Sequence, residues 1–492
     1  MRISRGQPNW QRKEGAAEER VDESVAGRWW IPGHEDLHAE GTANVYAKGL
    51  VWLDLDGDPW RDVAAERAST ELRTVLGETL ASTPMSLHAV RFFGGEEQPL
   101  IGRAHVRYIA DELIFGAHAE TDDDVLLSRI SVSFRGLREW LTGWASGTST
   151  PLTLVSPSPQ PGKEEPARSP DAWRRSLSLE IDEVQLVATV DRRQALTSRF
   201  RTVYDTTAIL RLESPEPKTL MDWRREWVDP LRNLVLFGTR EQTVLLFLRG
   251  RADDEAHTEV RAYRAPEVMI GEPNHVEYYQ RDLLPAGIWD GDGFSELIAS
   301  WLNLHIELGP VGAALFEILN TAEMPPLTRL LRLTSCAEGY QRALHDEPPF
   351  SQEDHNAMVD AMIAGLPEVT ETRRHYRDRL RYANSQSQRQ RIKWLINRAA
   401  EVDDRLTGQA SALTGRLVGW RNDQTHLDGE ISTPPLDDLL LLNAILTYVL
   451  EANMLLDLGI GDNTRYCLGH GHVWDDPVPT WLESRSSDDP AP

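Results

Sequence analysis

The spacing of apolar residues changes character near residue 290 of the chain. Before that point, apolar and β-branched residues alternate with polar ones and are interrupted by Gly, Pro and Asp, which is typical of strands separated by turns. After it, apolar residues recur every three or four positions, as they do along the buried face of a helix. The chain therefore predicts an α+β multidomain protein, with a β-rich N-terminal domain followed by a C-terminal all-α helical bundle.

Individual elements can be placed on this pattern. Strands are predicted at residues 44–55, 86–93, 105–115, 125–134, 177–190, 207–213 and 243–248, with helical pieces at 137–144 and 220–234 beside them. Bundle helices are predicted at residues 311–319, 326–343, 352–363, 371–382, 388–400, 409–420 and 435–458, from their apolar spacing and end signals.

These elements lead to a prediction of the domain limits. The β-rich domain should cover residues 21–290 and the bundle residues 291–460, with loosely ordered tails at 1–20 and 461–492. Residues 147–170, rich in Pro, Ser and charge, interrupt the β-rich domain and are expected to form an exposed flexible loop.

The longest apolar stretch, residues 439–458, has the length of a membrane span. Asn443, Glu451, Asn453 and Asp457 interrupt it at depths where polar groups are costly in lipid. We therefore expect a buried bundle helix and no membrane span.

Composition favours a cytoplasmic protein. There are two cysteines, Cys336 and Cys467, which is too few for a disulfide framework. Residues 1–20 are polar and charged, without the apolar core of a secretory signal. The net charge of −25 makes the whole molecule a poor non-specific partner for nucleic acid.

One segment departs from this acidic balance. Residues 373–398 carry nine basic side chains against one acid, a local net charge of 9 − 1 = +8. Arg389, Arg391, Lys393 and Arg398 are the candidates for holding an RNA backbone. The alternative is a solvated helix face that forms ion pairs with this acidic protein, and both interpretations stay open at this stage.

Candidate chemistry lies in residues 421–426, where Arg421 and Asn422 are followed by His426 between two apolar helical runs. Histidine can move protons near neutral pH, and arginine can place two donors on phosphate oxygens, which suits RNA cleavage by the ribose 2′-OH. Asn422 could orient either partner or the phosphate. One copy supplies a single histidine, so a symmetric dimer would complete the acid and base pair.

This hypothesis requires a local change in backbone. Residues five apart on an unbroken helix point about 140° away from each other, so we expect the helix to unwind near Asp423. In the alternative interpretation, Arg421 caps carbonyl groups at the end of a helix and His426 lies in a surface loop.

Residues 388–460 resemble the HEPN superfamily, helical bundles that carry an Arg-Asn-x-x-x-His motif, here Arg421 to His426. The layout is similar to the Apea-like subgroup, in which the bundle follows a large N-terminal domain. Residues 27–33 (GRWWIPG) and 130–141 (ISVSFRGLREWL) are similar to the N-terminal domain of ApeA-type anti-phage proteins.

The resemblance implies a defence protein that acts in abortive infection as a metal-independent endoribonuclease. Its catalytic residues would be Arg421, Asn422 and His426, paired across a homodimer, and its products would carry 2′,3′-cyclic phosphate ends. It also implies an RNA substrate, with tRNA among the candidates, a phage-derived trigger sensed by the N-terminal domain, and no cofactor. The competing hypothesis is a non-catalytic binding protein, whose Trp-rich β domain recognises a ligand while the bundle only mediates oligomerisation.

Two metal motifs are incomplete. Cys467, His470 and His472 offer three potential zinc ligands without a fourth, whereas structural zinc normally takes four. Residues 54–58 (DLDGD) resemble a calcium loop, but Ala65 stands where an EF-hand requires Glu, so a hairpin turn is predicted instead. We expect no metal site.

Overall fold

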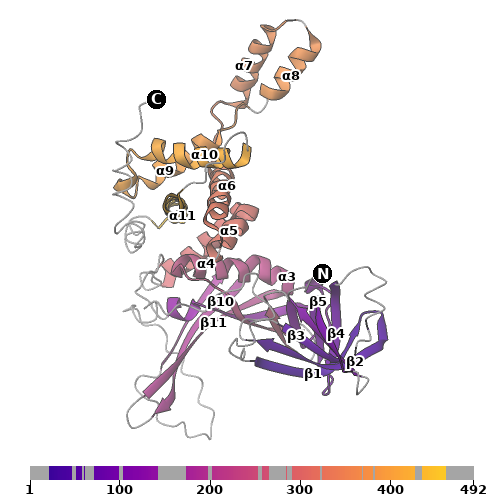
Figure 1. Ribbon diagram of the computed structural model, residues 1–492. Helices are drawn as coiled ribbons and strands as arrows, with labels where there is room; N and C mark the ends of the chain where they lie inside the picture. Colours follow the sequence, from indigo (N-terminus) through magenta and orange to yellow (C-terminus); the bar gives the residue numbers. More distant parts are fainter. Residues whose placement is uncertain are drawn as a thin grey trace, which may run out of the picture. The chain divides into compact units, whose positions relative to one another are not determined.

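The computed structural model describes residues 21–46, 51–57, 60, 71–98, 103–141, 173–197, 202–252, 258–264, 284, 291–321, 324–367, 369–380, 383–426 and 435–460 (Figure 1). Their contacts divide the chain into two compact units. The β unit comprises the described residues within 1–145, 149–232 and 243–272, and the helical unit those within 146–148, 233–242 and 273–492.

All the strands belong to the β unit. They are β1 (Val21–Ile31), β2 (His34–Tyr46), β3 (Val51–Asp56), β4 (Glu71–Thr79), β5 (Pro84–Gln98), β6 (Arg103–Ala110), β7 (Glu112–Phe115), β8 (Leu126–Phe134), β9 (Trp173–Ile181), β10 (Val184–Thr197), β11 (Thr202–Thr219), β12 (Leu245–Ala252) and β13 (Glu259–Arg264).

The first six strands form a closed antiparallel barrel. Neighbouring strands follow the order β4-β1-β2-β3-β6-β5, and a further pairing of β4 with β5 closes the ring. Its interior is apolar, with Trp29, Leu53 and Leu87 fully buried. Gly77 makes room for the ring of Trp29, since a Cβ there would lie 2.4 Å from a ring carbon. The sheet continues from β5 through β7, β13, β12, β8, β11 and β10 to β9.

The α+β fold class is confirmed, but several predicted strands were wrong in extent. Residues 44–55 contain the end of β2 and most of β3, and residues 105–115 contain parts of β6 and β7. Residues 177–190 form a hairpin, in which β9 turns into β10 at Asp182 and Glu183 with φ of 48° and 66°. β1, β4 and β13 were not predicted.

A buried ion pair joins the sheet to the helical turn that follows β11. This turn consists of α3 (Leu220–Trp223), the π-helical segment η3 (Arg224–Val228) and the start of α4 (Asp229–Thr239). The Arg224 guanidinium donates to both carboxylate oxygens of Glu112 on β7, with Nη1 3.0 Å from Oε2. Burial and the nearby charge of Arg264 lower the pKa of Arg224 to about 9, which leaves it charged at neutral pH.

The helical unit contains the end of α4 and the helices from residue 291 onward. They are α5 (Gly291–Asn320), α6 (Pro326–His345), α7 (Gln352–Ala364), α8 (Thr370–Leu380), α9 (Gln388–Ala399), α10 (Ala410–His426) and α11 (Leu436–Asp457), with short 3-10 turns at η2 (Asp122–Asp124) in the β unit and η5 (Asp404–Leu406) here. α5 bends at Gly309, whose φ is 49°, before Pro310. α5 begins well before its predicted start at residue 311, and α10 continues to His426 beyond its predicted end at residue 420. The other bundle helices start and end within about two residues of their predicted limits.

α11 is the central helix of this unit, and α6 and α9 pack against it. Leu442, Ile445 and Val449 are completely buried along it. α5, from residue 293, and α11 are long and apolar enough to cross a membrane by length and composition, and 72% of the most apolar window of α11 is buried inside the protein. α7 and α8 lie side by side as a separate pair (Figure 1).

The Arg224–Glu112 pair predicts a larger loss of stability for the single substitution than for the double one. Arg224→Gln leaves the Glu112 carboxylate buried without its guanidinium and should lower the unfolding free energy of the β unit by about 3–5 kcal/mol. Arg224→Met combined with Glu112→Leu removes both charges and should cost much less. Urea unfolding of the intact chain measures both, with the exposed neighbour Arg225→Gln as control. Equal losses in the single and double variants would contradict the role assigned to this pair.

Candidate functional site

The predicted catalytic residues lie on the last turns of α10 (Ala410–His426), which is one helix as far as His426. The expected unwinding near Asp423 is therefore wrong. Asn and Asp cost a helix only about 0.5–0.7 kcal/mol each relative to alanine, which is too little to end a helix held by tertiary packing. Leu413 and Leu417, in the preceding turns of α10, are both buried and hold the helix against the bundle up to that point.

Helix continuity determines where the motif residues can point. Positions 421 and 426 are about 140° apart around the axis of an α-helix, whereas positions 422 and 426 share one face. Arg421 is partly buried. The side chains of residues 422–426 lie outside the described part of the structure, so Asn422 and His426 are placed here by their backbone alone.

α9 (Gln388–Ala399) packs beside α10 and carries the four predicted RNA-binding residues. Ser387 caps its first turn by accepting from the Gln390 backbone N–H, and the Ser387 backbone N–H donates to Gln390 Oε1. Arg389 and Lys393 are exposed and lie one turn apart. Arg389 also extends over α10, since a Cβ added to Gly415 would lie 3.3 Å from its Nη2.

Arg391 is an interior residue. Its side chain is 1% exposed, and Nη1 lies 2.8 Å from an Asp346 carboxylate oxygen and 2.5 Å from Oε1 of Gln341. Nε donates to the carbonyl of Gln386 at 3.2 Å. With its donors engaged on α6 and the loops around it, Arg391 is not presented to an RNA backbone.

Arg398 is also engaged internally, in a cluster centred on Asp457. Its Nη2 donates to Asp457 Oδ1 at 2.5 Å, and its guanidinium lies 5.4 Å from the centre of the Trp394 ring. His345 Nε2 lies 3.1 Å from Asp457 Oδ2 and 3.0 Å from Arg398 Nη1. The Tyr340 hydroxyl donates to the same Oδ2. We call Tyr340, His345, Arg398 and Asp457 the Asp457 cluster; it links α6, α9 and the end of α11.

Only part of this cluster could be anticipated from the residues themselves. Asp457 was recognised as a polar interruption of an apolar stretch, but Tyr340 and His345 lie more than a hundred residues away from it. Only the packing of α6 beside α11 brings these groups together.

The outer face of the barrel carries an aromatic group around Trp52. Val51 and Leu53 point into the barrel, so Trp52 between them points outward. Its ring lies 5.0 Å from that of Phe93, which is 53% exposed, and 4.6 Å from the Arg107 guanidinium. Among the described residues, the Trp52 indole N–H has no hydrogen-bond partner. Trp52 and Phe93 thus offer aromatic surface on the outside of the barrel to a flat or aromatic ligand.

No three His, Cys, Asp or Glu side chains in the described residues could jointly hold a metal ion. Cys467, His470 and His472 lie outside those residues. Asp54, from the calcium-like segment, lies within β3 and accepts from Asn44 at 3.1 Å and from Arg107 at 2.5 Å.

Comparison with protein-family models gives two matches that cover most of the chain. Residues 24–301 match ApeA N-terminal domain 1, and residues 331–464 match Apea-like HEPN. The chain belongs to the ApeA family. Comparisons with curated proteins and with solved structures gave no match.

Most of the described helices and strands fall within one of the two family matches. In this ApeA-family protein, the N-terminal match runs from β1 into α5, and the HEPN match runs from within α6 past the end of α11. All three candidate catalytic positions and the whole Asp457 cluster fall within the HEPN match. The protein is thus a HEPN-type defence protein, and HEPN domains are generally nucleases.

Charge within the cluster makes the stability of the HEPN domain depend on pH. Burial alone would raise the pKa of Asp457, but hydrogen bonds from Arg398, Tyr340 and His345 outweigh it and lower that pKa. Burial and the Asp457 charge raise the pKa of Tyr340 well above its usual value. Because the Asp457 pKa is lower in the folded state, its stabilisation is present above the unfolded value of about 3.9 and is lost as pH falls through the folded value.

Asp457→Asn should therefore lower the unfolding temperature at neutral pH. The further decrease in unfolding temperature as the pH falls should be smaller for this variant than for wild type. The neutral-pH loss should correspond to about 3 kcal/mol, since Arg398 would be left partly buried without its carboxylate. Thermal unfolding of both proteins between about pH 6 and pH 3 gives the two curves. Asp360→Asn, which removes an exposed ion pair with Arg377, is the control. Parallel curves for Asp457→Asn and wild type would exclude this role for Asp457.

Proposed function

We propose that this protein is a metal-independent HEPN endoribonuclease of anti-phage defence, acting in the cytoplasm in abortive infection. One observation carries the proposal: an Arg-Asn-x-x-x-His sequence lies on α10 within the HEPN match. The proposed catalytic residues are Arg421, Asn422 and His426.

The continuous helix supports a site shared between two copies. The direction midway between positions 421 and 426 lies about 70° from each of them. A second copy of α10 packed against that face would bring two arginines and two histidines to one interface. A homodimer would then provide a general base and a general acid, which one copy lacks.

The proposed reaction needs only these side chains. One histidine accepts the proton of a ribose 2′-OH, and the oxygen attacks the adjacent phosphorus. The bond from phosphorus to the 5′ oxygen breaks, and the second histidine protonates the leaving oxygen. Arg421 stabilises the negative charge on the phosphoryl oxygens, and the products are a 2′,3′-cyclic phosphate and a 5′-OH.

RNA binding is assigned to the exposed side of α9 next to α10. Arg389 and Lys393 are the two exposed cations there, and neither forms an ion pair within the described residues. Arg391 and Arg398 are left out of the proposed surface because their guanidinium groups are engaged inside the protein. In the proposal, the substrate is RNA, with tRNA among the candidates, and the β unit senses a phage-derived trigger.

A second candidate function is favoured by the aromatic group around Trp52. A binding protein would use that surface to recognise its ligand, and the HEPN domain would serve only for oligomerisation. The two candidates differ in whether Arg421 and His426 are needed for RNA cleavage.

The cleavage assay uses purified protein, total RNA and a tRNA pool in EDTA. Wild type should give cleavage with cyclic phosphate ends, and His426→Ala and Arg421→Ala should each reduce the rate by at least about 100-fold. The matched controls are His375→Ala and Arg379→Ala, two exposed positions on α8, which should leave the rate unchanged.

Light scattering of the same samples should show at least a dimer in every variant. A His426→Ala protein that cleaves as fast as wild type would refute the catalytic assignment. If phage protection survived both motif substitutions but was lost on Trp52→Ala, the binding function would be favoured instead.

A further inference from the structure

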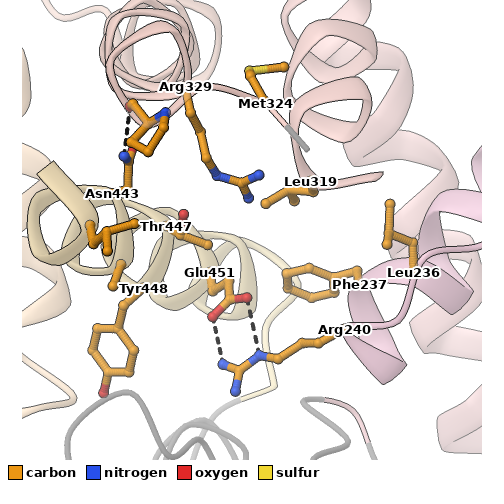
Figure 2. Close-up of a pocket in the computed structure, with 13 residues that line it drawn as sticks. Leu236, Phe237, Arg240, Leu319, Met324, Arg329, Asn443, Thr447, Tyr448 and Glu451 are labelled. Carbon is orange, nitrogen blue, oxygen red and sulfur yellow. Dashed lines mark hydrogen bonds and ion pairs between the residues drawn. The ribbon is translucent and has the colours of Figure 1, made fainter. Parts of the chain in front are cut away.

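A cavity of about 500 Å³ lies inside the helical unit. It is partly open to solvent and is bordered by the end of α4, the end of α5, the start of α6 and one side of α11 (Figure 2). Its volume is within the range of small-molecule sites, which are mostly apolar with a few placed polar groups. Among the described residues, none that lines it belongs to α10, the helix that carries the motif.

The apolar wall of the cavity comes from different helices. Leu236 and Phe237 belong to α4, Leu319 to α5, and Leu440 to α11, with Met324 in the segment before α6. A phenyl ring and a methionine side chain together suit a flat ring, because both make favourable contacts with aromatic groups.

Two of the charged residues in the wall neutralise each other. Arg240 Nη2 lies 2.6 Å from Glu451 Oε2, and Arg240 Nε lies 3.2 Å from Oε1 (Figure 2). This two-pronged pair fixes both side chains and contributes no net charge to the cavity.

Arg329 on α6 supplies a charge that is not neutralised in this way. Its Nη1 donates to the carbonyls of Ile318 and Thr321, both at 3.1 Å, at the end of α5. No carboxylate forms an ion pair with Arg329 in the described residues, and burial lowers its pKa. Figure 2 shows its guanidinium pointing between Leu319 and Thr447. A partly buried guanidinium without a carboxylate favours an anionic ligand.

Asn443 on α11 supplies an unused acceptor. Its side chain is 6% exposed, and its Nδ2 donates to the carbonyl of Pro326 at 2.8 Å. Its Oδ1 has no hydrogen-bond partner within the described residues. Oδ1 is itself enclosed by protein atoms. Buried acceptors are seldom left unpaired, and a turn of this amide toward the cavity would let Oδ1 accept from an N–H or O–H of a bound molecule.

We propose that the cavity binds a nucleoside 5′-monophosphate. This class combines the three features that the wall requires: an anionic group for Arg329, a flat ring for Phe237 and Met324, and ring or exocyclic N–H groups for Asn443 Oδ1. The proposal does not rest on ribonuclease activity, because it concerns binding at residues away from the motif.

The test is calorimetric titration of the intact protein with AMP, GMP, CMP and UMP, each beside its nucleoside, and with inorganic phosphate. At least one monophosphate should bind more tightly than both its nucleoside and phosphate. Arg329→Gln should weaken that binding by about 10- to 100-fold, the effect of losing a hydrogen bond to a charged group. Arg332→Gln, one turn along α6 and paired with Glu317 on the surface, should have no effect.

Two further variants distinguish binding in this cavity from binding at the motif. Ala444→Phe fills the cavity without removing Arg329, so it should abolish binding in a protein whose circular dichroism is unchanged. His426→Ala should bind the monophosphate as tightly as wild type does. If the monophosphate were instead a reaction product bound at the motif, His426→Ala would weaken its binding. Absence of binding by all four monophosphates, phosphate binding as tightly as any of them, or binding that survives both Arg329→Gln and Ala444→Phe would overturn the proposal.

Discussion

Burial of polar groups along α11 is the constraint on which the helical unit depends. This helix is apolar on most of its circumference, so it must lie inside the unit, and its polar side chains then require partners there. Asn453, which is 0% exposed, donates to the carbonyl of Leu395 on α9. Glu451 pairs with Arg240, directly after α4, and Asp457 with Arg398 on α9. Each of these polar positions therefore specifies which element lies beside α11.

The same constraint explains how far the sequence could predict the fold. Most bundle helices were predicted closely because apolar spacing and capping residues are local signals, whereas the first part of α5 and the last turns of α10 were missed. Strands were harder. β4 has only three apolar residues, Leu72, Val75 and Leu76, and they do not alternate with polar ones. The β9–β10 hairpin turns at Asp182 and Glu183 without glycine or proline. Closure of the barrel depends on the pairing of β4 with β5, which no local pattern specifies.

For the candidate site, the sequence indicated which residues are involved better than it indicated how they are arranged in space. The Arg-Asn-x-x-x-His sequence is local and could be read directly, but the expected break at Asp423 was wrong, because the weak helix preferences of Asn and Asp were overridden by packing. In the sequence, nothing distinguished the buried Arg391 and the partly buried Arg398 from the exposed Arg389. Their burial depends on Asp346 and Asp457, and only tertiary packing brings Asp457 to α9.

A chain of contacts connects the cavity to the helix that carries the motif. Tyr448 lines the cavity, and its hydroxyl donates to Asp403. Asp403 caps η5 by accepting from the backbone N–H of Arg405 at 3.0 Å, and η5 is followed after a few residues by α10. Burial and the Asp403 carboxylate raise the pKa of Tyr448, so it remains a hydrogen-bond donor at neutral pH. A molecule held against Tyr448 would thus contact the side chain that holds the Asp403 cap of η5, a few residues before α10 begins.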